Sequence, residues 1–136
     1  DELIKTIARG KKIAKEIHLP VQSGDNKILK KMNRGYTVVH YKNLIKKIRR
    51  KIPNVKISTD IIVGFPGETK KQFQNTVRLF EWAKFNNAYI ARYSPRPDTA
   101  AAKLKDDVSA DEKKRRWIIG KIIFLTARHI PSIFQY

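Results

Sequence analysis

The 136-residue sequence contains no cysteine. This absence excludes disulfides, thiolate zinc sites, cysteine nucleophiles and cysteine-ligated iron–sulfur clusters from this stretch of chain. The histidines His18, His40 and His129 lie too far apart in sequence to suggest a metal site, so we expect a core or surface role for each. No run of 18 apolar residues and no signal-peptide pattern is present, which predicts a cytoplasmic protein without a membrane partner.

Acidic residues are also scarce. The sequence has 30 Lys and Arg residues against 12 Asp and Glu residues, which gives a formal net charge of +18. Such an excess predicts a polyanionic partner, above all a nucleic acid. Because the basic residues are spread along the chain, solvated helix faces remain an alternative explanation. Charge of this kind gives affinity for nucleic acid but no sequence specificity.

The hydrophobic periodicity predicts alternating strands and helices. Strands are predicted at residues 17–21, 56–63 and 88–93, and helices after Asp25, Thr37, Thr69 and Ser109, with a further helix over residues 2–16 that Gly10 interrupts before Ile13 and Ala14. This alternation requires crossover connections and a mostly parallel sheet. In α/β barrels, ligands bind at the carboxyl ends of such strands.

The helix starts carry recognisable capping signals. Thr69 with Gln72, and Ser109 with Glu112, have the spacing of capping boxes. Asp25 is predicted to be an exposed cap of a short helix. The loops that follow the predicted strands are residues 22–24, 64–68 and 94–97, and a ligand site would lie there.

Asp60 is the most informative candidate residue because it stands inside an apolar strand. Side chains alternate along a strand, so Asp60, Ile62 and Gly64 share one face. A buried carboxylate costs several kcal/mol unless it is paired or hydrogen-bonded. Its partner could be the hydroxyls of a ribose, or a group of the protein such as Ser58 or a neighbouring strand's backbone.

Two further candidates are open to two interpretations each. Gly64 and Gly67 bracket Pro66, where the lack of side chains either lets a ligand approach the backbone or simply permits the turn. Arg34 follows the predicted short helix and could hold a carboxylate bidentately, or be one more surface cation among thirty.

Four blocks taken together are specific. Residues 18–24 (HLPVQSG), 31–37 (KMNRGYT), 57–69 (ISTDIIVGFPGET) and 93–99 (YSPRPDT) closely resemble, in order and spacing, the later half of the radical S-adenosylmethionine (SAM) methylthiotransferases. The resemblance covers about residues 1–117. The blocks are most similar to those of the branch that modifies isopentenyladenosine in tRNA.

The resemblance implies an α/β fold, namely the second half of a (βα)6 partial TIM barrel with about three parallel strands and covering helices. Residues 1–117 would be the C-terminal half of this barrel domain, and residues 118–136 a divergent C-terminal helix or tail. The implied reaction adds a methylthio group to C2 of N6-isopentenyladenosine in tRNA, using SAM and [4Fe-4S] clusters. Because the cluster ligands are absent here, this chain is expected to be inactive without the N-terminal half of the enzyme.

The resemblance also implies roles for individual residues. Gln22 and Asp60 would bond the SAM ribose, with Ser23 beside them, and Arg34 would hold the methionine carboxylate. The Gly64 turn and Tyr93 would lie near the adenine. No catalytic or metal-ligating residue is expected in this chain.

The sequence also departs from the family. Asp98 stands where family members commonly have glycine. Three alternatives stay open at this stage: a non-catalytic basic nucleic-acid-binding protein, a methylthiotransferase acting on threonylcarbamoyladenosine in tRNA or on a ribosomal protein, and a decayed gene product. A Cys-x-x-x-Cys-x-x-Cys motif upstream of the first residue would separate the enzyme from the binding protein.

Overall fold

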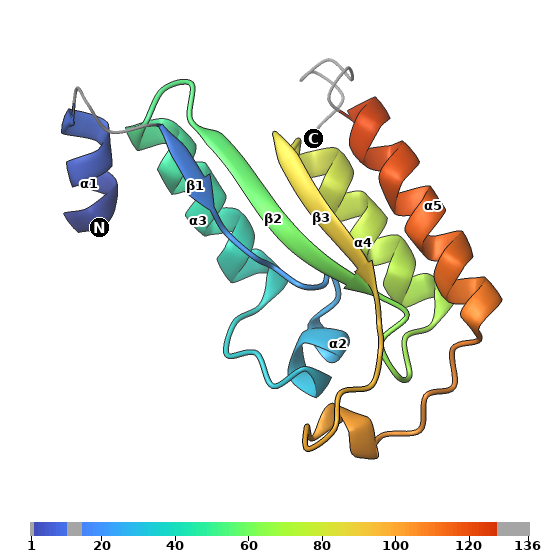
Figure 1. Cartoon of the computed structure of the whole chain (residues 1–136). Coiled ribbons are helices and arrows are strands. Elements are labelled where there is room, and N and C mark those ends of the chain that lie inside the picture. Colours follow the sequence, from blue (N-terminus) through green and yellow to red (C-terminus); the bar gives the residue numbers. More distant parts are fainter. Residues whose placement is uncertain (1, 11–14, 128–136) are drawn as a thin grey trace.

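The computed structural model describes residues 2–10 and 15–127. In chain order the elements are α1 (Glu2–Arg9), β1 (Glu16–His18), α2 (Asn26–Lys31), α3 (Val38–Lys51), β2 (Lys56–Val63), α4 (Lys70–Ala83), β3 (Asn87–Arg92), the short 3-10 helix η1 (Ala101–Lys103) and α5 (Ala110–Ala127). The strands lie side by side in front of α3 and α4, and α5 runs beside β3 (Figure 1).

All three strands are parallel, in the order β1-β2-β3. Ile17 pairs with Ile57, and Thr59 pairs with Ala88, so β2 is the central strand. Helices connect consecutive strands, as parallel pairing requires. The predicted α/β fold with three parallel strands and covering helices is therefore confirmed.

The two faces of β2 differ in burial. One face is fully buried and packs into the core with α3 and α4; it carries Ile57, Thr59, Ile61 and Val63. The opposite face, which we call the open face, is only half-buried; it carries Ser58, Asp60 and Ile62. The buried face carries three apolar residues and one threonine, whereas two of the three residues on the open face, Ser58 and Asp60, are polar.

The strand predicted at residues 17–21 ends earlier than expected. β1 stops at His18, and Gln22 rejoins the sheet through a bridge to Ile61. His18 pairs with Ser58, so four steps along the first segment correspond to three along β2, which is a bulge of one residue. Pro20 lies inside the bulge because it has no N–H to give to the ladder.

The helix starts follow their capping signals. Thr37 accepts from the backbone of His40, and Thr69 and Gln72 form a complete capping box. The box predicted at Ser109 is half formed. The Ser109 hydroxyl accepts from the Glu112 N–H at 3.1 Å, but the Glu112 carboxylate instead accepts from arginines of its own helix, Arg115 and Arg116.

The predicted exposure of Asp25 is wrong. Asp25 caps α2 as expected, with Oδ1 accepting from the N–H groups of Lys27 and Ile28. Its other oxygen accepts from Nδ2 of Asn75 on α4 at 2.8 Å, and the residue is only 8% exposed. This carboxylate therefore links α2 to α4. The local sequence predicts an exposed cap because it does not show that α4 packs over it.

Some predictions fall at the edges of the described chain. The resumption of the first helix at Ile13 and Ala14, and the role of His129, lie outside the described residues. The boundary predicted between residues 117 and 118 falls within α5, so it marks a change in sequence resemblance and not the end of an element. In the part of the chain that the structure covers, no helix combines the length and apolarity needed to cross a membrane.

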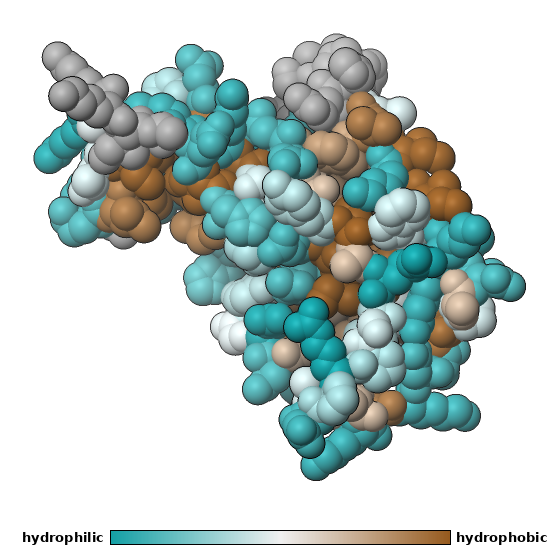
Figure 2. Space-filling model, viewed as in Figure 1, coloured by the Kyte–Doolittle hydropathy of each residue, from teal (hydrophilic) through white to brown (hydrophobic). Residues whose placement is uncertain are grey.

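The surface at the carboxyl end of the sheet differs from the surface along α5. Hydrophilic residues dominate the end at which the strands finish, and hydrophobic residues reach the surface along α5 (Figure 2). On α5 these are Ile118, Ile122 and Leu125. The end of the sheet where a ligand is expected is thus the polar one.

Candidate functional site

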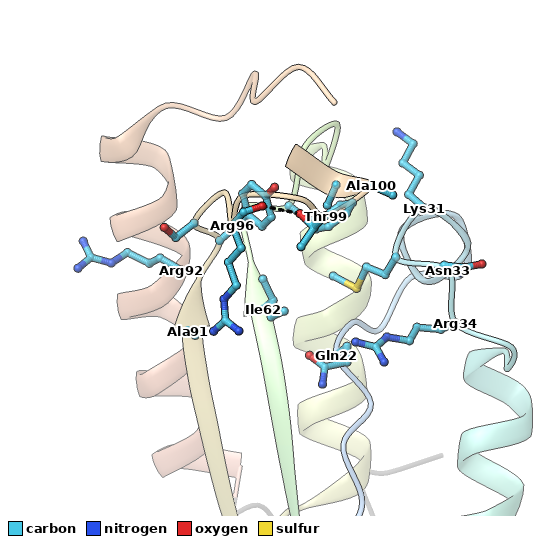
Figure 3. Close-up of a pocket in the computed structure, with 15 residues that line it drawn as sticks. Gln22, Lys31, Asn33, Arg34, Ile62, Ala91, Arg92, Arg96, Thr99 and Ala100 are labelled. Carbon is cyan, nitrogen blue, oxygen red and sulfur yellow. Dashed lines mark hydrogen bonds between the residues drawn. The ribbon is translucent and has the colours of Figure 1, made fainter. Parts of the chain in front are cut away.

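A pocket of about 470 Å³ lies at the carboxyl ends of the strands. Gln22 enters it from the bulged segment, Arg34 from the loop after α2, and Tyr93 from the end of β3. Arg34 extends toward Gln22 across the pocket (Figure 3). Three residues from three separate sequence blocks are therefore brought together by the fold.

Gln22 is held in an unusual backbone conformation. Its φ is +73°, in the left-handed region, which costs a non-glycine residue roughly 1–2 kcal/mol. Its N–H donates to the Asp60 carbonyl at 2.9 Å, and its carbonyl accepts from the Ile62 N–H at 3.0 Å. Pairing on both sides fixes the backbone while the side chain lines the pocket. Strain of this kind is concentrated at functional sites.

Asp60 is not among the residues that line the pocket. It lies on the open face of β2, where the next residue on the same face, Ile62, does line it. Oδ2 of Asp60 lies 3.0 Å from Nε2 of His18, whose Nδ1 lies 2.7 Å from the Ser58 hydroxyl. The Asp60 side chain is 39% exposed. Within the described residues nothing donates a hydrogen bond to its Oδ1, so this oxygen can accept one from a ligand.

His18 is the partner of Asp60 that the sequence did not indicate. The expected protein partners were Ser58 or a backbone group, and His18 was expected to have a core or surface role. The register places His18 beside Ser58, and the two residues and Asp60 project from the same side of neighbouring strands. A histidine in the first recognisable block, two residues before a proline, was the available signal.

Ser23 and Gly64 do not line the pocket. Ser23 is fully buried, and its Oγ accepts from the Asp25 N–H at 3.1 Å, so its hydroxyl supports the loop. Gly64 has a φ of +74°, and a Cβ placed there would come within 2.4 Å of Cγ of Lys113. Of the two interpretations offered for this glycine, the structure supports the conformational and packing one.

A buried ion pair holds the turn after β2. Glu68 Oε1 accepts from the Gly64 N–H and from Arg116 of α5, each at 2.9 Å, and Arg116 also donates to the Glu68 carbonyl. The side chains of Glu68 and Arg116 are 1% and 4% exposed. Burial raises the pKa of Glu68, although the Gly64 and Arg116 hydrogen bonds oppose the rise. This pair anchors the turn to α5 and does not face the pocket.

Tyr93 connects this anchor with the pocket. Its N–H donates to the Val63 carbonyl at 2.8 Å, and its ring meets Phe65 edge-on with centroids 5.2 Å apart. The hydroxyl is buried and has no hydrogen-bond partner among the described residues. The Lys113 ammonium lies 5.3 Å from the ring centroid. Phe65 and Lys113 therefore hold the ring in place, and the residue lines the pocket.

The pocket combines apolar surface with positive charge. Met32, Ile62 and Phe65 are among its apolar lining residues. Its charged lining residues are all cations: Lys31, Arg34, Arg92 and Arg96. Across residues 2–10 and 15–127 no group of three or more potential metal ligands occurs. The arrangement suits an organic ligand that carries an anionic group.

A parallel sheet with a pocket at the carboxyl ends of its strands is typical of α/β proteins, among them the (βα) barrels. Residues 1–80 match the Radical SAM superfamily. This match covers more than half of the 136 residues, and the chain belongs to that superfamily.

Curated relatives narrow the similarity further. The chain is 53% identical over 116 residues to the tRNA-2-methylthio-N(6)-dimethylallyladenosine synthase of Endomicrobium trichonymphae, covering 85% of this chain and 28% of that protein. It is 56% identical over 117 residues to the protein of the same name from Thermotoga petrophila, covering 85% and 26%. The Carboxydothermus hydrogenoformans protein of this name is 49% identical over 116 residues, with 85% and 26% covered. The chain thus spans about a quarter of the length of these relatives.

Proposed function

We propose that this chain supplies part of the SAM site of a tRNA methylthiotransferase that acts on N6-dimethylallyladenosine, which is the isopentenyladenosine of the sequence analysis. The observation that carries the proposal is the pocket that joins Gln22, Arg34 and Tyr93. The names of the relatives supply the reaction, and the similarity at about half of the aligned positions supports the transfer to this chain.

The residues fit the parts of SAM. Gln22 and Asp60 are neighbours across the bulge, and a side-chain amide and the free Oδ1 are suitable partners for two adjacent ribose hydroxyls. The Arg34 guanidinium can bind the methionine carboxylate in a bidentate manner. The apolar floor and the Tyr93 ring suit an adenine. Ser23 and Gly64 belong to this site as supports of its loops.

An iron–sulfur cluster does not fit this chain, because the sequence contains no cysteine to bind one. We assign the cluster to the missing N-terminal half of the enzyme. SAM bound at Gln22, Asp60 and Arg34 would supply radical chemistry once it received one electron from that cluster. The residues of this chain bind and orient the ribose and the carboxylate, as is usual where a cofactor carries the chemistry.

The remaining features follow from this assignment. Residues 1–117 form the C-terminal half of the barrel domain, and residues 118–136 a divergent C-terminal segment. The partner is tRNA, the location is the cytoplasm, and the chain without its N-terminal half is inactive. A purely nucleic-acid-binding role would use the same positive charge, but it would not require a strained Gln22 paired with Asp60.

A chimera tests the proposal. The corresponding segment of the Thermotoga petrophila synthase is replaced by this chain, and SAM affinity and methylthio transfer to tRNA are measured. Asp60→Ala should weaken SAM binding by roughly 10- to 150-fold, which corresponds to the loss of about 1.5–3 kcal/mol for a charged acceptor. Arg34→Ala should weaken binding of SAM to a similar extent.

The matched controls are Glu81→Ala and Arg50→Ala, which remove an exposed carboxylate and an exposed guanidinium far from the pocket. Both should bind SAM as the unaltered chimera does. The proposal fails if the chimera folds but binds no SAM, and the assignment of Asp60 fails if its alanine variant binds SAM as tightly as Glu81→Ala.

A further inference from the structure

The pocket holds more positive charge than SAM can use. Four cations and no carboxylate line it. SAM has one carboxylate, which one guanidinium satisfies, and its sulfonium and ammonium groups are themselves positive. If Arg34 binds that carboxylate, as proposed above, the other cations lack an anionic partner in the filled site.

Two of these cations are already engaged elsewhere. The Arg92 guanidinium lies 5.9 Å from the Trp117 ring centroid and points toward α5, away from the pocket (Figure 3). Lys31 packs against Gly67, whose N–H donates to Asp107 at 2.7 Å. This hydrogen bond, and to a smaller extent the charge of Lys31, lowers the pKa of Asp107. Arg96 is different, because in the described part of the chain no group accepts a hydrogen bond from its guanidinium.

The chain presents Arg96 rigidly. Pro95 and Pro97 flank it, so the backbone around it is restricted to extended conformations. The Arg96 carbonyl accepts from the Thr99 hydroxyl at 2.8 Å and from the Thr99 N–H at 3.4 Å. With Pro97 second and Asp98 third at a φ of +65°, residues 96–99 have the features of a type II turn. A side chain on such a turn binds with little loss of backbone entropy.

The direction of the side chain completes the observation. Arg96 extends from its turn along β3 toward Ala91, and Ile62 and Gln22 lie between it and Arg34 (Figure 3). The two guanidinium groups thus approach the pocket from opposite sides. A ligand anion at Arg34 leaves Arg96 available for a second anion at the other side of the same opening.

We propose that Arg96 binds a phosphodiester of the RNA substrate next to the nucleotide that enters the pocket. This inference rests on the proposed function, because it takes the RNA substrate and the SAM carboxylate at Arg34 from it. Guanidinium groups bind phosphate oxygens in a bidentate manner, and such contacts position a nucleic acid without reading its sequence. Arg96 would therefore set the depth and register of the RNA in relation to the pocket.

The test measures RNA binding to the full 136-residue chain as a function of salt. A tRNA anticodon stem-loop is titrated between about 50 and 200 mM salt, where each phosphate contact to a single strand contributes a slope of about −0.7 in log affinity against log salt. Arg96→Ala should make the slope less steep by about 0.7. Arg96→Lys should keep the slope, because a lysine also neutralises a phosphate.

Arg50→Ala is the matched control. It removes the same charge from an exposed position in the last turn of α3, at the end of the sheet opposite the pocket. Its slope should differ from that of the unaltered chain by much less than the slope of Arg96→Ala. Circular dichroism establishes that each variant is folded; Arg96 makes no side-chain hydrogen bond within the described residues that folding would require.

Three outcomes would count against the inference. Equal slopes for Arg96→Ala and Arg50→Ala would overturn it while leaving the SAM site untouched. A salt-independent affinity of the unaltered chain would overturn both it and the proposed RNA partner. Binding of inorganic phosphate that Arg96→Ala abolishes, together with an RNA salt slope that Arg96→Ala leaves unchanged, would indicate a site for free phosphate and overturn the assignment to RNA.

Discussion

Two carboxylates associated with β2 show how differently the same chemical group is used in this protein. Glu68 follows the strand, is buried, and is bound by Gly64 and Arg116. Asp60 lies within the strand on the open face, is 39% exposed, and is bound by His18 through one oxygen only. The first carboxylate holds two elements together, whereas the second has one oxygen that accepts no hydrogen bond from the described residues.

The comparison shows that the position of a carboxylate relative to the sheet, more than its charge, distinguishes one that stabilises the fold from one that is open to a ligand. A buried charge pair is costly to break, because the remaining partner is left in a medium that solvates it poorly. A half-exposed pair is solvated by water and contributes little to stability. The polar residues of the open face are therefore free to be selected for binding.

The largest expected effect comes from breaking the buried pair. Arg116→Ala should lower the free energy of unfolding by about 3–5 kcal/mol, because it leaves Glu68 uncompensated. Arg115→Ala is the matched control: Arg115 also bonds Glu112, but its side chain is 50% exposed, and its loss should cost less than about 1 kcal/mol. Denaturant unfolding followed by circular dichroism measures both. Equal losses would remove the distinction between the two regions.

Asp25→Ala should have the next largest effect. Asp25 caps α2 and also bonds Asn75, so its loss should cost about 2 kcal/mol, at the upper end of the range for caps. In the same unfolding experiment, Asn75→Ala should lower the free energy of unfolding by only part of this amount, since it removes only the link to α4. An Asp25→Ala cost near zero would show that this carboxylate belongs with the exposed ones.

A smaller effect of opposite sign is expected in the loop that presents Arg96. Asp98 has a φ of +65°, which glycine adopts without strain. Asp98→Gly should therefore raise the free energy of unfolding by about 0.5 kcal/mol, after the entropy cost of glycine is subtracted. Asp111→Gly, in the first turn of α5, should lower it by about 1 kcal/mol. A loss for both variants would argue against the turn conformation.

The smallest expected effect on stability is that of Asp60→Ala. Its hydrogen bond to His18 is half-exposed, so the free energy of unfolding should change by less than about 0.5 kcal/mol. Thermal and denaturant unfolding should both show this. A loss as large as that of Arg116→Ala would assign Asp60 to the structural group, and the contrast with Glu68 would disappear.

Most of the fold could be predicted because its signals are local. Residues 56–63 form β2 from end to end as predicted, since β-branched residues favour the strand conformation. Thr37 and Thr69 start their helices as predicted because a cap needs only its own next few residues. β1 ended early because Pro20 and the pairing partner on β2 together produce a bulge, and the partner lies 40 residues away.

The candidate site could be predicted only in part. The resemblance selected Gln22, Arg34 and Tyr93, and the structure brings these three into one pocket. It also selected Asp60, Ser23 and Gly64, which are not among the residues that line the pocket. The roles of all of these residues in SAM binding remain predictions that the chimera would test.

The sequence by itself determined the parallel α/β fold, the helix starts, the absence of cluster ligands and the family, because these depend on periodicity, composition and the order of motifs. Only the tertiary structure decided which polar groups meet. It paired Asp60 with His18, buried Asp25 against α4, and gave Glu68 to Arg116 of α5. The physical reason is that burial and hydrogen-bond partners are set by packing between segments that are distant in sequence, and no local pattern encodes them.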